Sequence, residues 1–146
     1  LLGRPRSAAA DVSLRGLAYY VDTYETETLG VTTINQAGQL GQPRFRWTAQ
    51  MAYAEGLWSG FLQARYSGTG YFDKRTAPTD LPQLKIGAQT LVDVNLAYEI
   101  PMASGTTSMY VNVTNLFNEL PPPFSGLGQN YDPIGRFYRV GVKAEF

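Results

Sequence analysis

The chain contains neither cysteine nor histidine. Without cysteine it can form no disulfide and no thiolate metal site. Without histidine it cannot build a Ser-His-Asp or Cys-His catalytic site, a two-histidine zinc motif or an imidazole proton shuttle. We therefore predict no catalytic residue, no metal ligand and no cofactor site, and we do not expect an enzyme.

An excess of charge and a long hydrophobic run are missing too. Twelve Lys and Arg balance twelve Asp and Glu, so the formal net charge is zero and nothing favours nucleic-acid binding. No apolar stretch approaches the about 20 residues that a membrane-spanning helix needs, and residues 1–10 are too short and too polar for a complete signal peptide. If the chain meets a membrane, it does so as strands.

Glycine and aromatic residues are abundant, with 15 Gly, ten Tyr, seven Phe and two Trp among 146 residues. This usage suits strands and tight turns. Period-two alternation predicts six strands, at residues 11–21, 44–54, 57–67, 90–100, 107–117 and 136–146. Each is close to the about 9 to 11 residues of a tilted transmembrane strand, whereas a mean globular strand has about 5 to 6. We therefore predict an all-β antiparallel meander of about six long strands, tall enough for a barrel wall.

The predicted connections alternate in length. Residues 22–43, 68–89 and 118–135 form long ones, whereas the turns around 55–56 and 103–105 are short. In an antiparallel meander consecutive connections lie at opposite ends, so the sheet has a long-loop end and a short-turn end. Outer-membrane barrels show this asymmetry, with short periplasmic turns and longer extracellular loops.

Each predicted strand has one apolar side. This apolar face holds Val12, Leu14, Gly16, Ala18, Tyr20, Phe45, Trp47, Ala49, Met51, Tyr53, Trp58, Gly60, Leu62, Ala64, Tyr66, Val92, Val94, Leu96, Tyr98, Ile100, Met109, Val111, Val113, Tyr138, Val140, Val142, Ala144 and Phe146. It contains no charged residue. The opposite, polar face carries Arg15, Arg46, Arg65, Asp93, Glu99, Arg139, Lys143 and Glu145, with Leu17, Tyr19, Leu57, Phe61 and Leu91 as apolar exceptions.

Aromatic residues of the apolar face gather near both strand ends. Near the short turns lie Tyr53, Trp58, Tyr98 and Phe146, and near the long loops lie Tyr20, Phe45, Trp47, Tyr66 and Tyr138. Two aromatic bands around an aliphatic middle match the girdles at the two lipid–water interfaces of a membrane barrel. We therefore predict that the apolar face meets lipid; a sheet packed on a protein core is the alternative.

Six strands cannot close a lipid-facing barrel from one chain, because the smallest such barrels have about eight. An open edge in lipid leaves backbone groups unpaired, at several kcal/mol each. The chain is thus predicted to be a piece of a larger barrel or one protomer of an oligomeric one. A start at Leu1, without Met or a signal sequence, favours a piece.

Two segments carry a family resemblance. MYVNVTNLFNELPPP, residues 109–123, holds Asn115, Leu116, Phe117 and Asn118, and YDPIGRFYRVGVKAEF, residues 131–146, holds Gly135, Arg136, Tyr138, Gly141 and Phe146. Together they resemble the carboxy-terminal end of TonB-dependent outer-membrane receptors, where an N-L-F-N/D segment and a loop precede a final GR-x-Y/F-x-x-G-x-x-x-x-F strand. Residues 43–73 and 92–100 also resemble strands of that family.

The resemblance implies a 22-stranded transmembrane β-barrel in the outer membrane of a Gram-negative bacterium. Residues 1–146 are then the carboxy-terminal segment of the barrel, its last six strands, without the plug domain and the upstream strands. Members of the family import scarce nutrients, of the ferric siderophore, cobalamin or glycan class, with energy from the TonB complex that engages the plug. Without the plug, this segment alone is not expected to transport.

The implied partners are outer-membrane lipid, the barrel-assembly machinery and a small-molecule or metal-chelate substrate. Phe146, read together with Tyr138, is the expected assembly signal, or else only a girdle aromatic. Tyr24, Tyr71, Phe72, Phe124 and Tyr131 are candidates for stacking on substrate, although loop aromatics also pack loops. The polar-face charges are candidates for contacts with the plug or with a ligand, or they solvate a hydrated lumen.

A second hypothesis belongs to a different class. A soluble or oligomeric β-sheet module, with no transport role, would use the apolar face as a protein interface. Dependence on detergent separates the two hypotheses.

Overall fold

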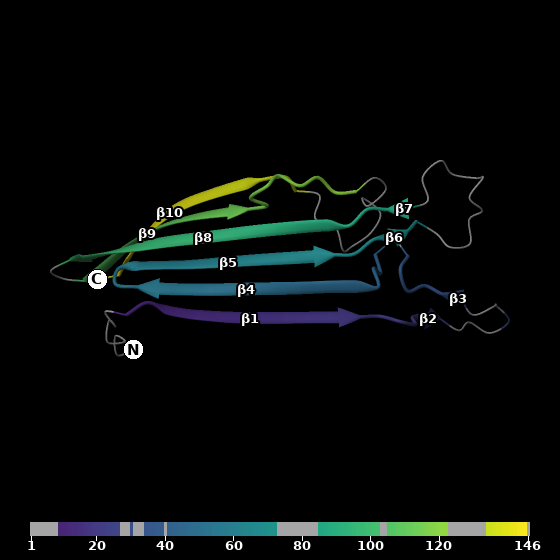
Figure 1. Ribbon diagram of the computed structural model, residues 1–146. Coiled ribbons are helices and arrows are strands. Elements are labelled where there is room, and N and C mark those ends of the chain that lie inside the picture. Colours follow the sequence, from purple (N-terminus) through teal and green to yellow (C-terminus); the bar gives the residue numbers. More distant parts are fainter. Residues whose placement is uncertain are drawn as a thin grey trace.

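The computed structural model describes residues 9–26, 30, 34–39, 41–72, 85–102, 105–122 and 134–145. Six long strands form one antiparallel sheet: β1 (Asp11–Tyr20), β4 (Phe45–Glu55), β5 (Trp58–Ser67), β8 (Gln89–Met102), β9 (Gly105–Thr114) and β10 (Phe137–Glu145). Their order in the sheet, β1-β4-β5-β8-β9-β10, is their order in the chain (Figure 1). The predicted all-β meander of six long strands is confirmed. Within the described ranges, no helix has the length and apolarity to cross a membrane.

The connections divide between the two ends of the sheet as predicted. Gly56 and Leu57 make the tight turn from β4 to β5, and the connection from β8 to β9 lies at the same end (Figure 1). The strand ends that the three long connections join lie at the other end. Two of these connections contain short ribbons that the alternation did not predict, namely β2 (Glu25–Thr26) with β3 (Ile34–Asn35) and β6 (Gly70–Tyr71) with β7 (Lys85–Ile86).

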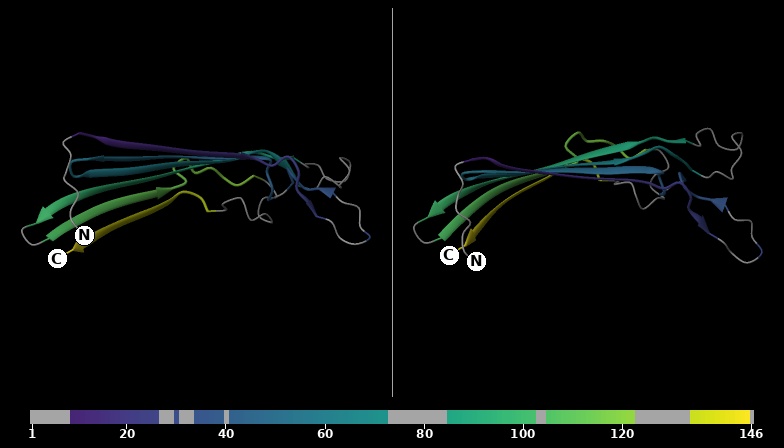
Figure 2. Two further views of the ribbon diagram at one scale, coloured as in Figure 1. Left: turned by 90° about the horizontal axis from the view of Figure 1, so that it is seen from below. Right: turned by 60° about the horizontal axis from the view of Figure 1, so that its bottom comes forward.

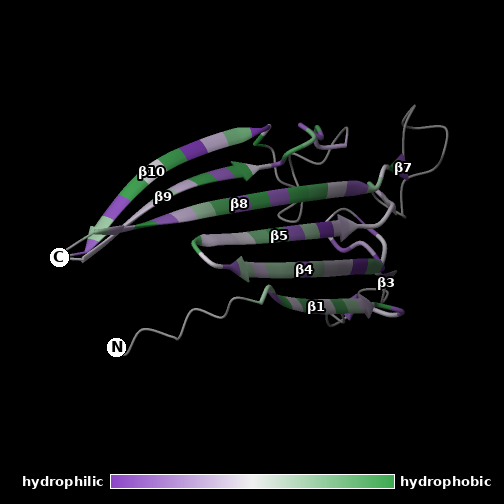
Figure 3. Ribbon diagram, turned by 60° about the vertical axis from the view of Figure 1, so that its left-hand side comes forward, coloured by the Kyte–Doolittle hydropathy of each residue, from purple (hydrophilic) through white to green (hydrophobic). Residues whose placement is uncertain are grey.

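The strand register confirms the two predicted faces. One row of cross-strand neighbours runs through the whole sheet: Leu14, Met51, Leu62, Val94, Val113 and Tyr138. All six belong to the apolar face, and because directly paired residues share a face, the assignment holds for every strand. Figure 3 shows the resulting alternation of hydrophobic and hydrophilic residues along the strands.

The apolar face is uncovered. Leu14 is 78% exposed and Val140 is 74% exposed. Among the described residues the buried hydrophobic side chains are only Ala37, Ile86 and Leu91, so no core lies beneath this face. Exposed apolar surface of this extent marks contact with a membrane or with another protein. The sheet is curved (Figure 2). It is also open, because the edge strands β1 and β10 each have only one neighbouring strand in the described sheet.

Ring contacts join aromatic residues at both ends of the apolar face. Near the short turns, Trp58 and Tyr98 are cross-strand neighbours with ring centroids 4.7 Å apart. Near the long loops, Tyr66 stacks on Trp47 at 5.8 Å and meets Phe45 at 6.1 Å. Such pairs add about 0.5–1.5 kcal/mol beyond the burial of their area.

Two strand boundaries differ from the prediction in an informative way. Strand β9 ends at Thr114, whereas the prediction extended it to residue 117. Asn115 and Asn118 adopt positive φ values of 53° and 55° and turn the chain out of the sheet. Strand β8 begins at Gln89, one residue before the predicted start, so Gln89 belongs to the sheet.

Candidate functional site

A pocket of about 190 Å³ lies on the polar face near the long-loop end. Its lining comes from β1, β4, β5 and β8: Tyr19, Arg46, Trp47, Thr48, Arg65, Tyr66, Ser67, Gln89 and Leu91. Four adjacent strands therefore build it, and we call it the polar-face pocket. Its position on rigid strands, beside the loops, suits a binding site.

Two cross-strand rows supply the side chains of the pocket. The outer row, nearer to the loops, is Tyr19, Arg46, Ser67 and Gln89, and the next row is Leu17, Thr48, Arg65 and Leu91. Tyr19 and Leu91 were apolar exceptions on the polar face, and both line the pocket. Leu91 is only 6% exposed, so it supplies an apolar wall among polar groups.

Arg46 connects the pocket to the first long loop. Its Nη1 donates to the hydroxyl of Tyr19 at 3.1 Å, and its Nη2 donates to the carbonyl of Gly41 at 3.0 Å. Its guanidinium carbon also lies 5.9 Å from the centre of the Tyr19 ring. The guanidinium is thus held in place by β1 and by the loop segment that precedes β4.

Arg65 is held by Asp93 on the neighbouring strand. Arg65 Nη2 lies 2.9 Å from Asp93 Oδ2, and Asp93 Oδ1 accepts a hydrogen bond of 2.9 Å from the backbone N–H of Asn115. The Arg65 side chain is 40% exposed and the Asp93 side chain 19%, so solvent partly screens this pair. Asp93 therefore joins the pocket to the start of the last long connection.

Within the part of the chain that the structure describes, two nitrogen donors of the pocket are buried without a hydrogen-bond partner. They are Nε2 of Gln89, a residue only 3% exposed, and Nε of Arg65. Buried polar atoms are nearly always paired, so each such atom needs an explanation. The pocket therefore has hydrogen-bond donors for which the described residues supply no acceptor.

A second polar cluster closes the base of the last connection. Asn115 is 1% exposed, and its Oδ1 accepts from the backbone N–H of Glu119 at 2.8 Å. Its Nδ2 donates to the carbonyls of Glu119 at 2.9 Å and Ile134 at 3.2 Å. Asn118 Oδ1 accepts from the backbone N–H of Arg136 at 2.9 Å. The two asparagines of the NLFN segment thus hydrogen-bond to residues at the start and at the end of the last connection, and hold these two parts of the chain together.

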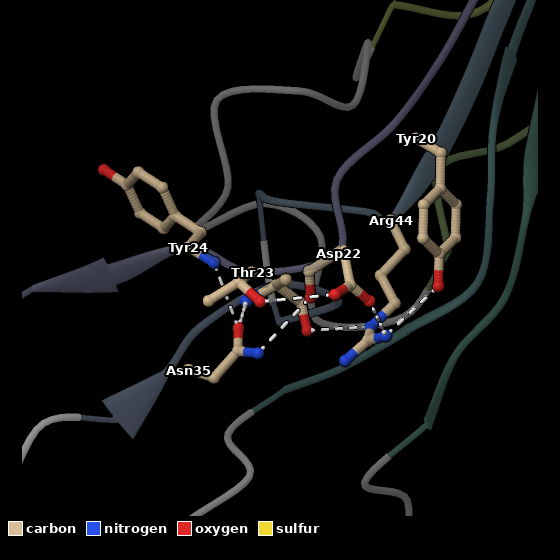
Figure 4. Close-up of polar contacts among 7 residues, drawn as sticks. Tyr20, Asp22, Thr23, Tyr24, Asn35 and Arg44 are labelled. Atoms are coloured by element: carbon tan, nitrogen blue, oxygen red, sulfur yellow. Dashed lines mark hydrogen bonds and ion pairs between the residues drawn. The ribbon is translucent and has the colours of Figure 1, made fainter.

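A third cluster closes the base of the first connection (Figure 4). Arg44 Nη1 donates a hydrogen bond of 3.2 Å to the hydroxyl of Tyr20. The same nitrogen lies 3.7 Å from Oδ1 of Asp22. The hydrogen bond to Tyr20 is the main cause that raises the pKa of Arg44 above its ordinary value. Asn35 Oδ1 accepts from the backbone N–H groups of Tyr24 and Ala37, at 3.1 and 2.9 Å.

The structure separates the predicted polar-face charges into groups. Arg46, Arg65 and Asp93 meet at or beside the pocket. Lys143 and Glu145 pair with each other near the short-turn end. The remaining three are Arg139, whose guanidinium carbon lies 5.8 Å from the ring centre of Phe137, and Arg15 and Glu99, which do not line the pocket.

The predicted loop aromatics are not gathered at one point. Tyr24 and Tyr71 are 45% and 44% exposed and lie in different connections, and within the described residues no ring contact joins them. Phe72 is half-buried. Tyr138 is exposed on the apolar face, with the guanidinium carbon of Arg136 5.7 Å from its ring centre. The predicted residues Phe124, Tyr131 and Phe146 lie outside the described residues.

The sequence prediction missed Gln89 and the structural role of Asn115. Gln89 had a signal, because the period-two pattern of Leu91 and Asp93 extends back to it. For Asn115 the only signal is its place in the NLFN motif. In the part of the chain that the structure describes, no three Asp, Glu, His or Cys side chains gather where they would hold a metal ion.

Comparison with known proteins assigns most of the chain to a family. The family model described as "TonB dependent receptor-like, beta-barrel" matches residues 7–116, which is most of the chain and includes β1 to β9. The match ends within the NLFN segment, so β10 lies beyond it. No curated protein and no solved structure matches significantly.

Proposed function

The chain belongs to the TonB-dependent receptor β-barrel family, and from that membership we propose that it is part of an outer-membrane transporter that imports a scarce nutrient. The nutrient is of the ferric siderophore, cobalamin or glycan class. Energy comes from the inner membrane through the TonB complex, which engages a plug domain outside these 146 residues. The family consists of receptors and transporters rather than enzymes.

One observation carries the proposal beyond family membership. Among the described residues the apolar face runs across all six strands, carries one charged side chain, Glu55 at the short-turn end of β4, and has no core beneath it. In a soluble protein that surface would need a partner of equal extent, whereas lipid covers it without one. The polar face then lines the lumen, where charged residues are tolerated.

We propose that residues 1–146 form the carboxy-terminal six strands of a 22-stranded barrel. The short-turn end is then periplasmic and the long-loop end extracellular. The open edges at β1 and β10 pair with strands of the rest of the barrel, so that no backbone group is left unpaired in lipid.

We also propose roles for the aromatic residues. Phe146, with Tyr138, is the signal that the barrel-assembly machinery reads. Tyr24, Tyr71, Phe72, Phe124 and Tyr131 form the extracellular surface that first meets substrate. Deleting Phe146 from the full-length receptor tests the assembly role, since normal insertion of that variant into the outer membrane would contradict it.

The transport proposal is tested in a Gram-negative host that lacks its own receptor for each candidate nutrient. The full-length receptor is expressed in strains with and without TonB, and uptake of radiolabelled nutrient is measured. Uptake that needs both the receptor and TonB supports the proposal. Uptake that is equal without TonB contradicts it, as does a receptor found only in the soluble fraction.

A further inference from the structure

We propose that the polar-face pocket binds an anionic oxygen group, a carboxylate or a phosphate, of the receptor's small-molecule substrate. This inference rests on the proposed transport function and adds the chemical class of the ligand. Three features of the pocket carry it: its unpaired donors, its charge and its size.

The unpaired donors define what the ligand must supply. Nε2 of Gln89 and Nε of Arg65 are both buried, and neither has a hydrogen-bond partner among the described residues. Gln89 is 97% buried, so bulk water does not satisfy it, and an acceptor atom placed in the pocket would. The Tyr19 hydroxyl accepts a hydrogen bond from Arg46, which leaves its own proton available as a further donor.

The charge of the pocket selects an anion. Among the described residues, Arg46 and Arg65 contribute two positive charges to the lining of the pocket, and the carboxylate of Asp93 pairs with Arg65. Both oxygens of Asp93 are engaged, one by Arg65 and the other by the backbone N–H of Asn115. These two arginines and Asp93 together carry a net charge of one positive unit. Charge-assisted hydrogen bonds from arginine to carboxylate or phosphate are among the strongest in proteins.

The size of the pocket restricts what enters it. Its volume is about 190 Å³, whereas pockets that enclose an entire drug-sized ligand measure about 300 to 1,000 Å³. The pocket therefore takes one group of a ligand whose remainder lies in the lumen or against the loops. Leu91 adds an apolar wall beside the polar groups of the pocket.

The test uses the purified full-length receptor in detergent, with citrate and inorganic phosphate as probes. Binding is measured by titration calorimetry. Two variants remove the donor: Gln89→Glu places a negative charge in the pocket, and Gln89→Met keeps the volume without a polar group. The control is Ser59→Glu, which adds the same charge on the polar face at the exposed, short-turn end of β5.

We expect saturable binding of at least one probe to the unmodified receptor. Gln89→Glu should weaken binding by about tenfold or more, because like charges repel at close range. Gln89→Met should weaken it about threefold to tenfold, the effect of losing one hydrogen bond to a charged group. Ser59→Glu should leave the dissociation constant unchanged. The unliganded Gln89→Met receptor should melt at the same or a higher temperature, because no buried donor remains unpaired.

Three results would overturn the inference. They are no saturable binding of either probe, binding that Gln89→Glu leaves unchanged, and a fall in the melting temperature of both unliganded Gln89 variants. The last would mean that an acceptor of the receptor itself, such as a plug carboxylate, already fills the pocket. Failure of the transport proposal would appear separately, as uptake independent of TonB, while anion binding to the purified receptor persisted.

Discussion

The ring of Tyr110 on β9 lies against Gly141 on β10. The two residues are cross-strand neighbours, and a Cβ added to Gly141 would lie 2.4 Å from both Cζ and the hydroxyl oxygen of Tyr110. No real Cβ tolerates that separation. An alanine at this position would therefore force the Tyr110 ring to move, which gives a physical reason for a glycine in this strand.

Replacing Gly141 with Ala should destabilise the barrel. The ring of Tyr110 would have to leave its position across the strand pair, and overpacking of this kind costs about 1–3 kcal/mol. The measurement is the urea midpoint of the receptor refolded into detergent micelles.

Gly16→Ala is the matched control for this substitution. An added Cβ at Gly16 meets no atom within 4 Å, so we expect little change or a slight gain. In the double variant Tyr110→Ala/Gly141→Ala, the Gly141 substitution should cost much less, because the ring is gone. Equal effects of Gly141→Ala and Gly16→Ala would contradict the close approach of Tyr110.

The two faces of β8 should respond very differently to a positive charge. Val94 on the apolar face lies between Leu62 and Val113, whereas Asn95 on the polar face lies between Phe61 and Asn112. Arginine at the lipid midplane of a barrel costs about 2–4 kcal/mol, and in the lumen it costs little. Val94→Arg should therefore reduce the heat-modifiable, inserted receptor in outer membranes far more than Asn95→Arg. Similar loss in both variants would mean that the faces are assigned wrongly.

The sheet could be predicted from the sequence because its signal is local. Period-two alternation is set within each strand, and it gave six strands to within a few residues and the membership of both faces. The cross-strand row from Leu14 to Tyr138 then follows once short turns fix the order of neighbours. The aromatic bands were predictable for the same reason.

The polar-face pocket could not be predicted in the same way, because it depends on contacts between distant segments. The burial of Gln89 requires four strands to meet in one register. Arg46 is held by Gly41, and the first two long connections are tied by a hydrogen bond of 2.7 Å from the Tyr71 N–H to the Gly38 carbonyl. No periodic pattern encodes such loop contacts. Arg46 and Arg65 could therefore be predicted as polar-face charges, but their meeting at one pocket could not.

Substitutions at Asn115 should separate backbone strain from hydrogen bonding. Both Asn115→Gly and Asn115→Ala remove the side-chain bonds to Glu119 and Ile134. Glycine adopts the positive φ of 53° without strain, whereas alanine pays about 1–2 kcal/mol for it. We expect both variants to be less stable in urea than the unmodified receptor, with alanine the worse of the two. Equal stability of the two would show that strain at this position is negligible.

Asp93 should matter more to stability than its partner Arg65. Arg65→Gln removes a partly exposed ion pair, which is worth about 0.2–1 kcal/mol after screening by solvent. Asp93→Ala removes the same pair and also leaves the backbone N–H of Asn115 without its acceptor. An unpaired buried donor adds about 1–3 kcal/mol to the loss.

Urea unfolding of the two single variants and of the double variant measures this difference as a thermodynamic cycle. Asp93→Asn is the matched control, because its amide oxygen still accepts from the Asn115 N–H while the ion pair is lost. Its cost should therefore resemble that of Arg65→Gln and fall well below that of Asp93→Ala. If Asp93→Asn were as damaging as Asp93→Ala, the charge of Asp93, and not its bond to the start of the last connection, would be what stabilises this part of the sheet.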